Sequence, residues 1–222
     1  MEQSLLGPAR RGDGVRDGLP RPGARAVRRR RHPVREGAGT MTGDDCRQPL
    51  RRHGIARLSR ADRDAGRTVW DADLGGRKLV VDQIAVGEAD APERMAGVLG
   101  IAPGERLCTR SRRYSLDGKP VLLATSYLSA DLVAGTPITW ENPGPGGIYA
   151  RLADLGCAPV RFREEVRARM PSPEEAGRLG LGSGTPVVLV ARTAYTGDGR
   201  AVEVNEMVLD SAAYILEYDF PA

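Results

Sequence analysis

APERMAGVLGIAPGERLCTRSRRYSLDGKPVLLATSYL occupies residues 91–128, and SPEEAGRLGLGSGTPVVLVARTAYTGDGRAVEVNEMVL occupies residues 172–209. Both stretches have Pro-Glu at their second and third positions and later carry an Asp-Gly pair between two apolar runs. Ser172 and Glu175 also have the spacing of a capping box, which starts a helix. Each stretch therefore predicts a short helix, a strand, an Asp-Gly hairpin and a second strand. Two copies of one unit that share a sheet leave a cleft between their hairpins, and we expect the functional site there.

Flanking segments complete an α+β pattern. Residues 78–86 predict a strand, residues 147–155 predict a short helix ended by a glycine, and residues 214–220 predict a last strand. Residues 160–170 alternate between apolar and charged side chains. This alternation is typical of an antiparallel strand with one buried and one solvated face. Glu164 interrupts the apolar face of that strand.

Charge is distributed unevenly along the 222 residues. Residues 1–60 contain 15 arginines, no lysine and 6 acids, a balance of +9, whereas the remainder contains 18 basic and 23 acidic residues, a balance of −5. Prolines and glycines interrupt every candidate element before residue 55, and few apolar residues offset the entropy cost of folding. We expect residues 1–56 to form a basic, disordered segment and residues 57–222 to form the folded domain.

The residue content disfavours several classes of protein and of site. Three cysteines are too few for a disulfide framework, and no apolar run suits a membrane span or a secretory signal, so we expect a cytoplasmic protein without a membrane partner. The two histidines, His32 and His53, precede the predicted domain. A Ser-His-Asp or Cys-His site is therefore not expected in that domain, and zinc would lack ligands. We expect no metal, no cofactor and no catalytic residue.

Arg110 and Arg112 are the clearest candidate binding residues. The two-residue period of a strand places both on one face, about 6 to 7 Å apart. Neighbouring cations repel each other unless an anion neutralises them, and the guanidinium fork matches phosphate and carboxylate oxygens. A ligand that carries such a group is one interpretation. Cross-strand salt bridges to Glu203 or Glu206 are the structural alternative.

Glu203 and Glu206 lie on the closing strand of the second unit, where an acid on an apolar face needs a partner. One interpretation makes Glu203 an acceptor for hydroxyl or amino groups of a ligand. The alternative is a structural pair with Arg192 or Arg112. The sequence alone does not separate the two.

A glycine-rich loop at residues 142–147 precedes the predicted helix at residue 148. Backbone amides at the positive end of a helix can hold an anion, although such loops also occur without ligands. Tyr114, Tyr127, Tyr149 and Tyr195 can line a pocket with a polar rim. Tyrosines in strands, however, more often belong to the core.

Several motifs occur together and in order within residues 57–222. They are Arg112-Arg113-Tyr114-x-x-Asp117-Gly118-x-Pro120, Ser126-Tyr127-Leu128, Gly144-x-Gly146-Gly147-Ile148-Tyr149, Glu165-Val166-Arg167-Ala168-Arg169, Pro186-Val187 to Arg192-Thr193-Ala194-Tyr195, and Gly199-Arg200-x-Val202-Glu203. As a set they resemble the UTRA effector-sensing domain of bacterial GntR-type transcription regulators of the HutC subfamily. The resemblance implies a chorismate-lyase-like fold, in which helices flank an antiparallel sheet, with a small-molecule site between the hairpins and usually a homodimer.

The resemblance also implies roles for individual residues. Arg112 matches the anion-binding arginine of the family, and Glu203 matches the acid that binds polar groups of the effector. The Gly146-Gly147 turn and Tyr149 match the helix start that helps to hold a phosphate. In relatives the effector is often a sugar phosphate, an amino sugar phosphate or a small acid. The predicted effector-binding residues are Arg110, Arg112, Tyr114, Ser126, Gly146, Gly147, Tyr149, Arg192, Tyr195, Glu203 and Glu206.

Members of this family carry a winged helix-turn-helix before the effector domain, and residues 1–56 show no pattern of one. DNA is therefore expected as a partner only if such a head is present. The leading hypothesis is a ligand-sensing regulator in which effector binding changes the geometry of a dimer. The runner-up is a small lyase on the same fold, with Arg112 holding a carboxylate and Glu203 as acid or base. A third is a stand-alone ligand-binding or dimerisation domain.

Overall fold

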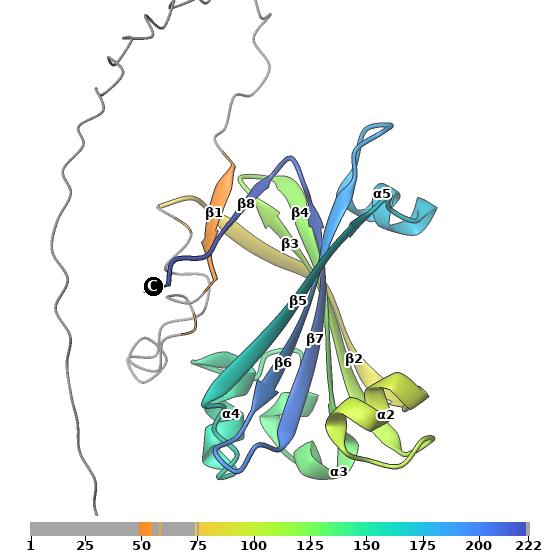
Figure 1. The fold of residues 1–222 in the computed structure, drawn as a ribbon, viewed down its shortest axis with the longest axis vertical. Helices are drawn as coiled ribbons and strands as arrows, with labels where there is room; N and C mark the ends of the chain where they lie inside the picture. The colour runs from red at the N-terminus through yellow and green to blue at the C-terminus, as the bar shows by residue number, and fades with distance from the viewer. Residues whose placement is uncertain (1–48, 55–57, 59–73, 75, 221–222) are drawn as a thin grey trace, which may run out of the picture. The chain divides into compact units, whose positions relative to one another are not determined.

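Figure 1 shows the fold in the computed structural model, which describes residues 49–54, 58, 74 and 76–220. The strands are β1 (Leu50–His53), β2 (Leu79–Asp90), β3 (Arg106–Leu116), β4 (Lys119–Ser129), β5 (Arg161–Arg169), β6 (Val187–Tyr195), β7 (Ala201–Asp210) and β8 (Tyr214–Glu217). The helices are α2 (Glu93–Leu99), α3 (Ala130–Val133), α4 (Gly147–Asp154) and α5 (Pro173–Leu179), with the 3₁₀ helix η2 (Pro137–Thr139) before α4. The predicted α+β class is confirmed. None of the described helices is long and apolar enough to cross a membrane.

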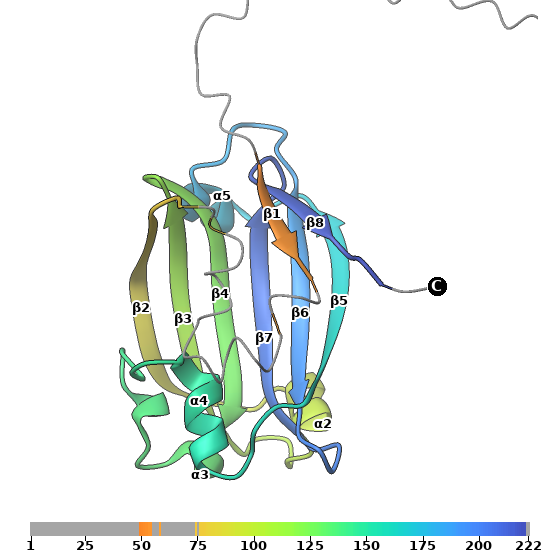
Figure 2. The same ribbon diagram turned by 90° about the vertical axis from the view of Figure 1, so that its left-hand side faces the viewer.

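Six strands form one antiparallel sheet in the order β2-β3-β4-β7-β6-β5, and Figure 2 shows them side by side. The repeat is visible in this order, since β2, α2, β3 and β4 correspond to β5, α5, β6 and β7. The two hairpins meet where β4 pairs with β7, from Leu122 opposite Leu209 to Tyr127 opposite Val204. The prediction of two hairpins in one sheet is therefore correct, and each unit also includes the strand before its helix.

The two hairpins turn differently although both contain Asp-Gly. Asp117 and Gly118 have φ values of 51° and 87°, which suit the tight two-residue turn that this pair favours. In the second hairpin Gly199 has a φ of 86°, and the Thr196 N–H donates to the Arg200 carbonyl at 2.9 Å. This second turn is wider, so the same dipeptide marks the place of a hairpin without fixing its type.

Each helix of the repeat packs on a strand of the other half. Leu99 of α2 packs with Val204 of β7, and Leu179 of α5 packs with Leu123 of β4. Both helices lie behind the sheet as drawn in Figure 2. Burial of either helix therefore needs both halves of the sheet, which ties the two repeats into one hydrophobic core.

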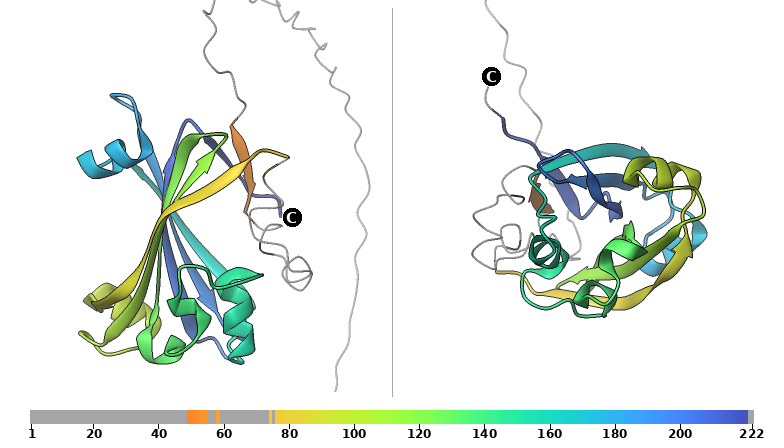
Figure 3. Two further views of the ribbon diagram at one scale, coloured as in Figure 1. Left: turned by 180° about the vertical axis from the view of Figure 1, so that it is seen from behind. Right: turned by 90° about the horizontal axis from the view of Figure 1, so that it is seen from below.

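The opposite face of the sheet has two partial covers. Strands β1 and β8 pair in parallel, and Leu50 of β1 packs with Leu122 and Met207. At the other end Leu152 of α4 packs with Leu128. Figure 3 (right) shows α4 and α2 on opposite sides of the sheet. The part of the sheet between β1 and α4 is where the site lies.

The position of β1 changes the predicted domain boundary. Leu50–His53 forms a strand of 4 residues that pairs with β8, so the predicted start of the domain at residue 57 is too late in the chain. His53 is part of this strand, and its Nδ1 lies 3.3 Å from Glu217 Oε1. A pairing between segments so far apart leaves no local sequence signal. Residues 1–48, where most of the predicted disordered segment falls, lie outside the described residues.

The predicted buried face of residues 160–170 is largely exposed. Val166 and Met170 have exposed fractions of 47% and 56%. The reason is that β5 is an edge strand, which pairs only with β6 in the described sheet. The predicted alternation of apolar and charged residues is present in β5. Because β5 lies at the edge of the sheet, no other described element packs on much of its apolar face.

The capping box at the start of α5 predicts a pH-dependent contribution to stability. Glu175 Oε2 accepts the Ser172 N–H at 2.7 Å, and Arg169 donates to both Glu175 oxygens at 2.6 and 2.7 Å. Arg169 above all lowers the pKa of Glu175 from 4.5 to about 2. Because the folded pKa lies below the unfolded one, the stabilisation is complete above about pH 5 and is lost as the pH falls through about 2.

We expect Glu175→Gln to lower the free energy of unfolding by about 1 to 2 kcal/mol at pH 7, a range that allows for the partial exposure of Arg169. Urea unfolding of wild type and variant at pH 7, 4 and 2.5 measures this difference. The difference in the free energy of unfolding between wild type and variant should become smaller from pH 7 to pH 4 and again from pH 4 to pH 2.5. A difference that stays constant with pH would contradict the assignment.

Candidate functional site

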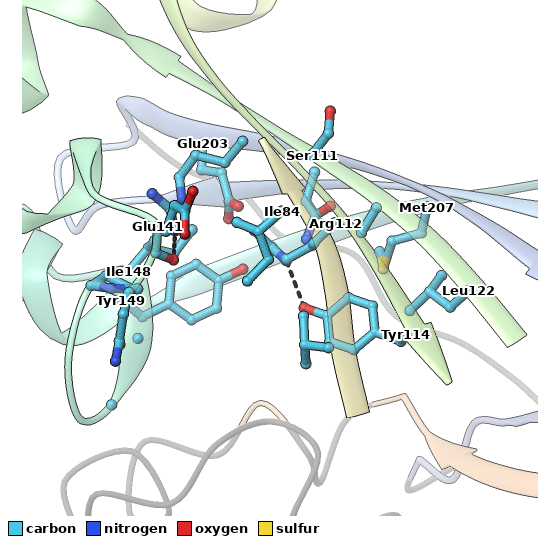
Figure 4. Close-up of a pocket in the computed structure, with 18 of the residues that line it drawn as sticks. Ile84, Ser111, Arg112, Tyr114, Leu122, Glu141, Ile148, Tyr149, Glu203 and Met207 are labelled. Atoms are coloured by element: carbon cyan, nitrogen blue, oxygen red, sulfur yellow. Dashed lines mark hydrogen bonds between the residues drawn. The ribbon is translucent and has the colours of Figure 1, made fainter. Parts of the chain in front are cut away.

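A cavity of about 590 Å³ lies where the two hairpins meet, between the sheet and the loop before α4. Apolar side chains form much of its wall: Leu79, Val81, Ile84, Leu122, Ile148 and Met207. Polar side chains also line it, as Figure 4 shows for several of them: Arg110, Ser111, Arg112, Tyr114, Glu141, Asn142, Tyr149, Arg192, Glu203 and Asn205. An apolar wall with a few convergent polar groups is the usual composition of a small-molecule site.

An irregularity in β2 brings Ile84 to the cavity. The register with β3 shifts between Asp82 and Ala85, and Gln83 has a φ of 49°. Val81 lines the cavity, so a regular strand would present residue 83 next. A bulge re-aims the following side chain, and Ile84 takes that place.

A row of polar side chains crosses five strands on the cavity side of the sheet. Arg110 of β3 pairs with Ser126 of β4, which pairs with Asn205 of β7. Asn205 pairs with Arg192 of β6, which pairs with Glu164 of β5. Except for Glu164, which is partly buried, all are buried. Buried polar groups need hydrogen-bond partners. The partners of each side chain show which groups are bonded within the protein and which are available to a ligand.

Arg110 is used structurally. Its Nη1 donates to the carbonyls of Ile138 and Trp140, and its Nη2 donates to the Glu141 carbonyl at 3.0 Å. Burial, and then the positive charge of Arg112, lowers the pKa of Arg110. The predicted salt bridges of Arg110 to Glu203 or Glu206 are not found among the described residues. Arg110 instead holds the segment that leads from η2 to α4.

Arg112 is the cation that the described residues leave available. Its Nε donates to the Tyr114 hydroxyl at 2.6 Å and its Nη2 to Ser126 Oγ at 3.1 Å; Figure 4 shows the first of these bonds. No ion pair joins Arg112 to a carboxylate in the described part of the chain. Burial opposes its charge, but Tyr114 and Glu203 outweigh burial and raise the pKa of Arg112. Arg112 therefore stays cationic at the cavity wall.

Glu203 is a buried acceptor with the Tyr149 hydroxyl as a neighbouring donor. Its exposed fraction is 0%, and neither carboxylate oxygen accepts a hydrogen bond of regular geometry from the described residues. Asn205 Oδ1, on the same face of β7, is also buried and unpaired there. Burial, and then the negative charge of Glu203, raises the pKa of Tyr149, so that hydroxyl stays protonated. Buried acceptors of this kind favour a ligand that brings donors.

Arg192 is paired, but with Glu164 rather than with Glu203. Its Nε donates to Glu164 Oε1 at 2.8 Å. Arg52 of β1 donates to the same oxygen through Nη2 at 2.7 Å. The predicted structural pair of Glu203 with Arg192 or Arg112 is therefore not formed among the described residues.

The N-terminus of α4 borders the cavity. Gly146 is the N-cap residue with a φ of 75°, and Gly147 has a φ of 65°. A Cβ at position 146 would lie 2.7 Å from the Ala150 Cβ, so conformation and space both require glycine there. The Asn142 side chain accepts the Gly144 N–H at 2.9 Å and shapes the loop. The positive end of the helix thus lies at the cavity.

Comparison with known proteins decides the family. Residues 75–215 match the model of the UTRA domain, a span that includes every strand from β2 to β7. The chain belongs to the UTRA domain family. The resemblance that the sequence motifs indicate is thereby confirmed.

Proteins similar in sequence to this UTRA-domain protein are transcription regulators. An uncharacterised HTH-type transcriptional regulator of Streptomyces coelicolor is 34% identical over 180 residues, which are 78% of this chain and 67% of the relative. An HTH-type transcriptional regulator of Mycobacterium tuberculosis is 32% identical over 77% of this chain and 59% of its own length. The HTH-type repressor PhnF of Mycolicibacterium smegmatis is 27% identical over 86% of this chain and 80% of its own.

Solved structures show the same fold. The effector domain of PhnF from Mycobacterium smegmatis has a TM-score of 0.65 at 24% identity, covering 78% of this chain and all of that domain. A GntR-family regulator has a TM-score of 0.61 at 28% identity, covering 67% of this chain and 61% of the other. These similarities confirm the predicted sheet flanked by helices.

The cavity of the UTRA domain brings together most of the predicted site residues. Those that line it are Arg110, Arg112, Tyr114, Gly146, Gly147, Tyr149, Arg192 and Glu203. Ser126 is fully buried and orients Arg112. Two do not reach the cavity. Glu206 pairs with Arg94 of α2 on the opposite face, and Tyr195 lies 3.7 Å beneath the Arg161 guanidinium.

The placement of Glu206 has a simple cause. Glu203 and Glu206 are three residues apart in one strand, and a period of two sends them to opposite faces. Asn205 was missed as a site residue although it shares the face of Glu203. Glu164 was also missed, although its interruption of an apolar face was a signal in the sequence.

Arg110 gives a prediction for the UTRA domain. We expect Arg110→Met to lower the free energy of unfolding by about 2 to 4 kcal/mol, because three backbone carbonyls lose a charged donor. Arg110→Lys should retain only part of the stability that Arg110→Met loses, since an ammonium group lacks the planar fork of a guanidinium group. Urea unfolding measures both variants. Equal stability of Arg110→Met and wild type would contradict the structural role.

Proposed function

We propose that this chain is the effector-sensing part of a GntR-type transcription regulator, and that its cavity binds a small anionic metabolite that also carries hydroxyl or amino groups. One observation carries the proposal: a fully buried Glu203, whose oxygens accept no hydrogen bond of regular geometry from the described residues, lines the same cavity as a cationic Arg112. The first group needs hydrogen-bond donors, and the second attracts an anion. A single ligand with both kinds of group satisfies both.

The charge balance supports an anion. In the described part of the chain, four guanidinium groups and three carboxylates cluster at and beneath the cavity: Arg52, Arg110, Arg112, Arg192, Glu141, Glu164 and Glu203. Burial makes this excess of positive charge costly. An anionic group beside Arg112 and the N-terminus of α4 offsets the excess.

The regulatory part of the proposal rests on the relatives. They are HTH-type transcription regulators, and this chain spans 67% and 59% of the lengths of two of them. We propose that effector binding changes the geometry of a homodimer, and through it the affinity for DNA of an attached winged-helix head. A cytoplasmic location follows from that role.

The cavity predicts which variants lose ligand. We expect at least one of glucosamine 6-phosphate, glucose 6-phosphate, inorganic phosphate and small carboxylic acids to raise the melting temperature of wild type. Arg112→Met and Glu203→Gln should each lower the affinity for that ligand by about 10- to 100-fold, because each removes a hydrogen bond to a charged group. Thermal-shift titration followed by calorimetry measures both effects.

Two matched variants serve as controls. Glu206→Gln removes the acid on the opposite face of β7, and Tyr195→Phe alters a tyrosine outside the cavity, so neither should change the affinity. If no compound stabilises wild type more than Arg112→Met, the site assignment fails. Turnover of an aromatic acid such as chorismate would favour the alternative, a small lyase with Glu203 as acid or base.

A further inference from the structure

Glu164 holds two arginines that belong to different parts of the molecule. Glu164 Oε1 accepts from Arg52 Nη2 at 2.7 Å and from Arg192 Nε at 2.8 Å. Its Oε2 accepts from the Tyr218 hydroxyl at 3.0 Å. Arg52 is on β1, whereas Arg192 lines the cavity. One carboxylate oxygen therefore connects the cavity to the first described strand.

Arg52 is a principal polar anchor of β1. Its exposed fraction is 2%, its Nη1 has no hydrogen-bond partner among the described residues, and its Nη2 also lies 3.8 Å from Met207 Sδ. Met207 lines the cavity as well. A buried charge whose described carboxylate partner is shared thus contributes to the attachment of β1, beside its pairing with β8 and the packing of Leu50.

Arg192 and Arg52 compete for the shared oxygen. Arg192 Nη2 also lies 2.8 Å from Glu164 Oε1, so both guanidinium groups crowd one atom in a buried place. Burial, and then the positive charge of Arg192, lowers the pKa of Arg52. Like charges so close repel each other strongly where water is excluded. A change in the charge of one arginine must therefore alter the hold on the other.

We infer that Glu164 couples the cavity to β1, so that neutralising Arg192 strengthens the bond of Glu164 to Arg52 and the attachment of β1. An anion that contacts Arg192 neutralises it in this sense. Glu164 is a positioning residue, since it acts through the two arginines. By linkage, firm attachment of β1 also favours binding of that anion. The coupling rests on the proposed function only for the identity of the neutralising group.

Hydrogen exchange on ligand-free protein tests the coupling. Arg192→Met removes the cavity charge and mimics its neutralisation, and it should slow amide exchange at residues 50–54 about threefold or more relative to amides of β7. Glu164→Gln should speed exchange there about tenfold or more, because two buried arginines lose their charged partner. Arg192→Lys keeps the charge and should not slow exchange.

Arg112→Met is the matched control, because it removes a cavity charge that has no described contact with Glu164. It should leave exchange at residues 50–54 unchanged. The inference is overturned if Arg192→Met leaves exchange in β1 unchanged or speeds it, or if Glu164→Gln has no effect there. Neither outcome touches the ligand titrations of Arg112 and Glu203, so failure of the coupling and failure of the site remain distinguishable.

Discussion

The pairing of β4 with β7 is the constraint on which the rest of the molecule depends. It joins the two repeated hairpins into one sheet and lets α2 and α5 each pack on the other half. It also sets the register that brings Ser126 beside Asn205. A slip of one residue there would turn one half of the polar row to the helix-covered face. Fold and site are therefore fixed by the same ladder of hydrogen bonds.

Buried charge is the second organising feature. Three of the four buried arginines bind protein carbonyls or a carboxylate: Arg110 binds carbonyls, and Arg52 and Arg192 bind Glu164, whereas Arg112 binds only hydroxyl groups of the described residues. The desolvation of both partners in such a buried pair offsets much of the energy of their attraction. Their effect is to fix positions, which leaves Arg112 and Glu203 as the groups that we propose contact the ligand. The same rigidity connects the cavity to β1.

Much of the fold follows from local sequence. The Asp-Gly pairs, the capping box at Ser172 and the glycine after each repeat helix locate both units within a few residues. The predictions failed where the cause was not local. β1 needed a distant partner in β8, and the apolar side of β5 lost its cover because the strand lies at an edge.

The sequence by itself determined the repeat, the alternation of its strands and the division of arginines and acids between the two copies. Period two was enough to place Arg110 beside Arg112, and it also separates Glu203 from Glu206, although both were predicted to bind the effector. Only the tertiary structure decided which charged groups are occupied by protein partners. The packing of the loop before α4 supplies the carbonyls that Arg110 binds, and the register between β5 and β6 places Glu164 beside Arg192. Pairings between strands that are distant in the chain leave no pattern in the local sequence.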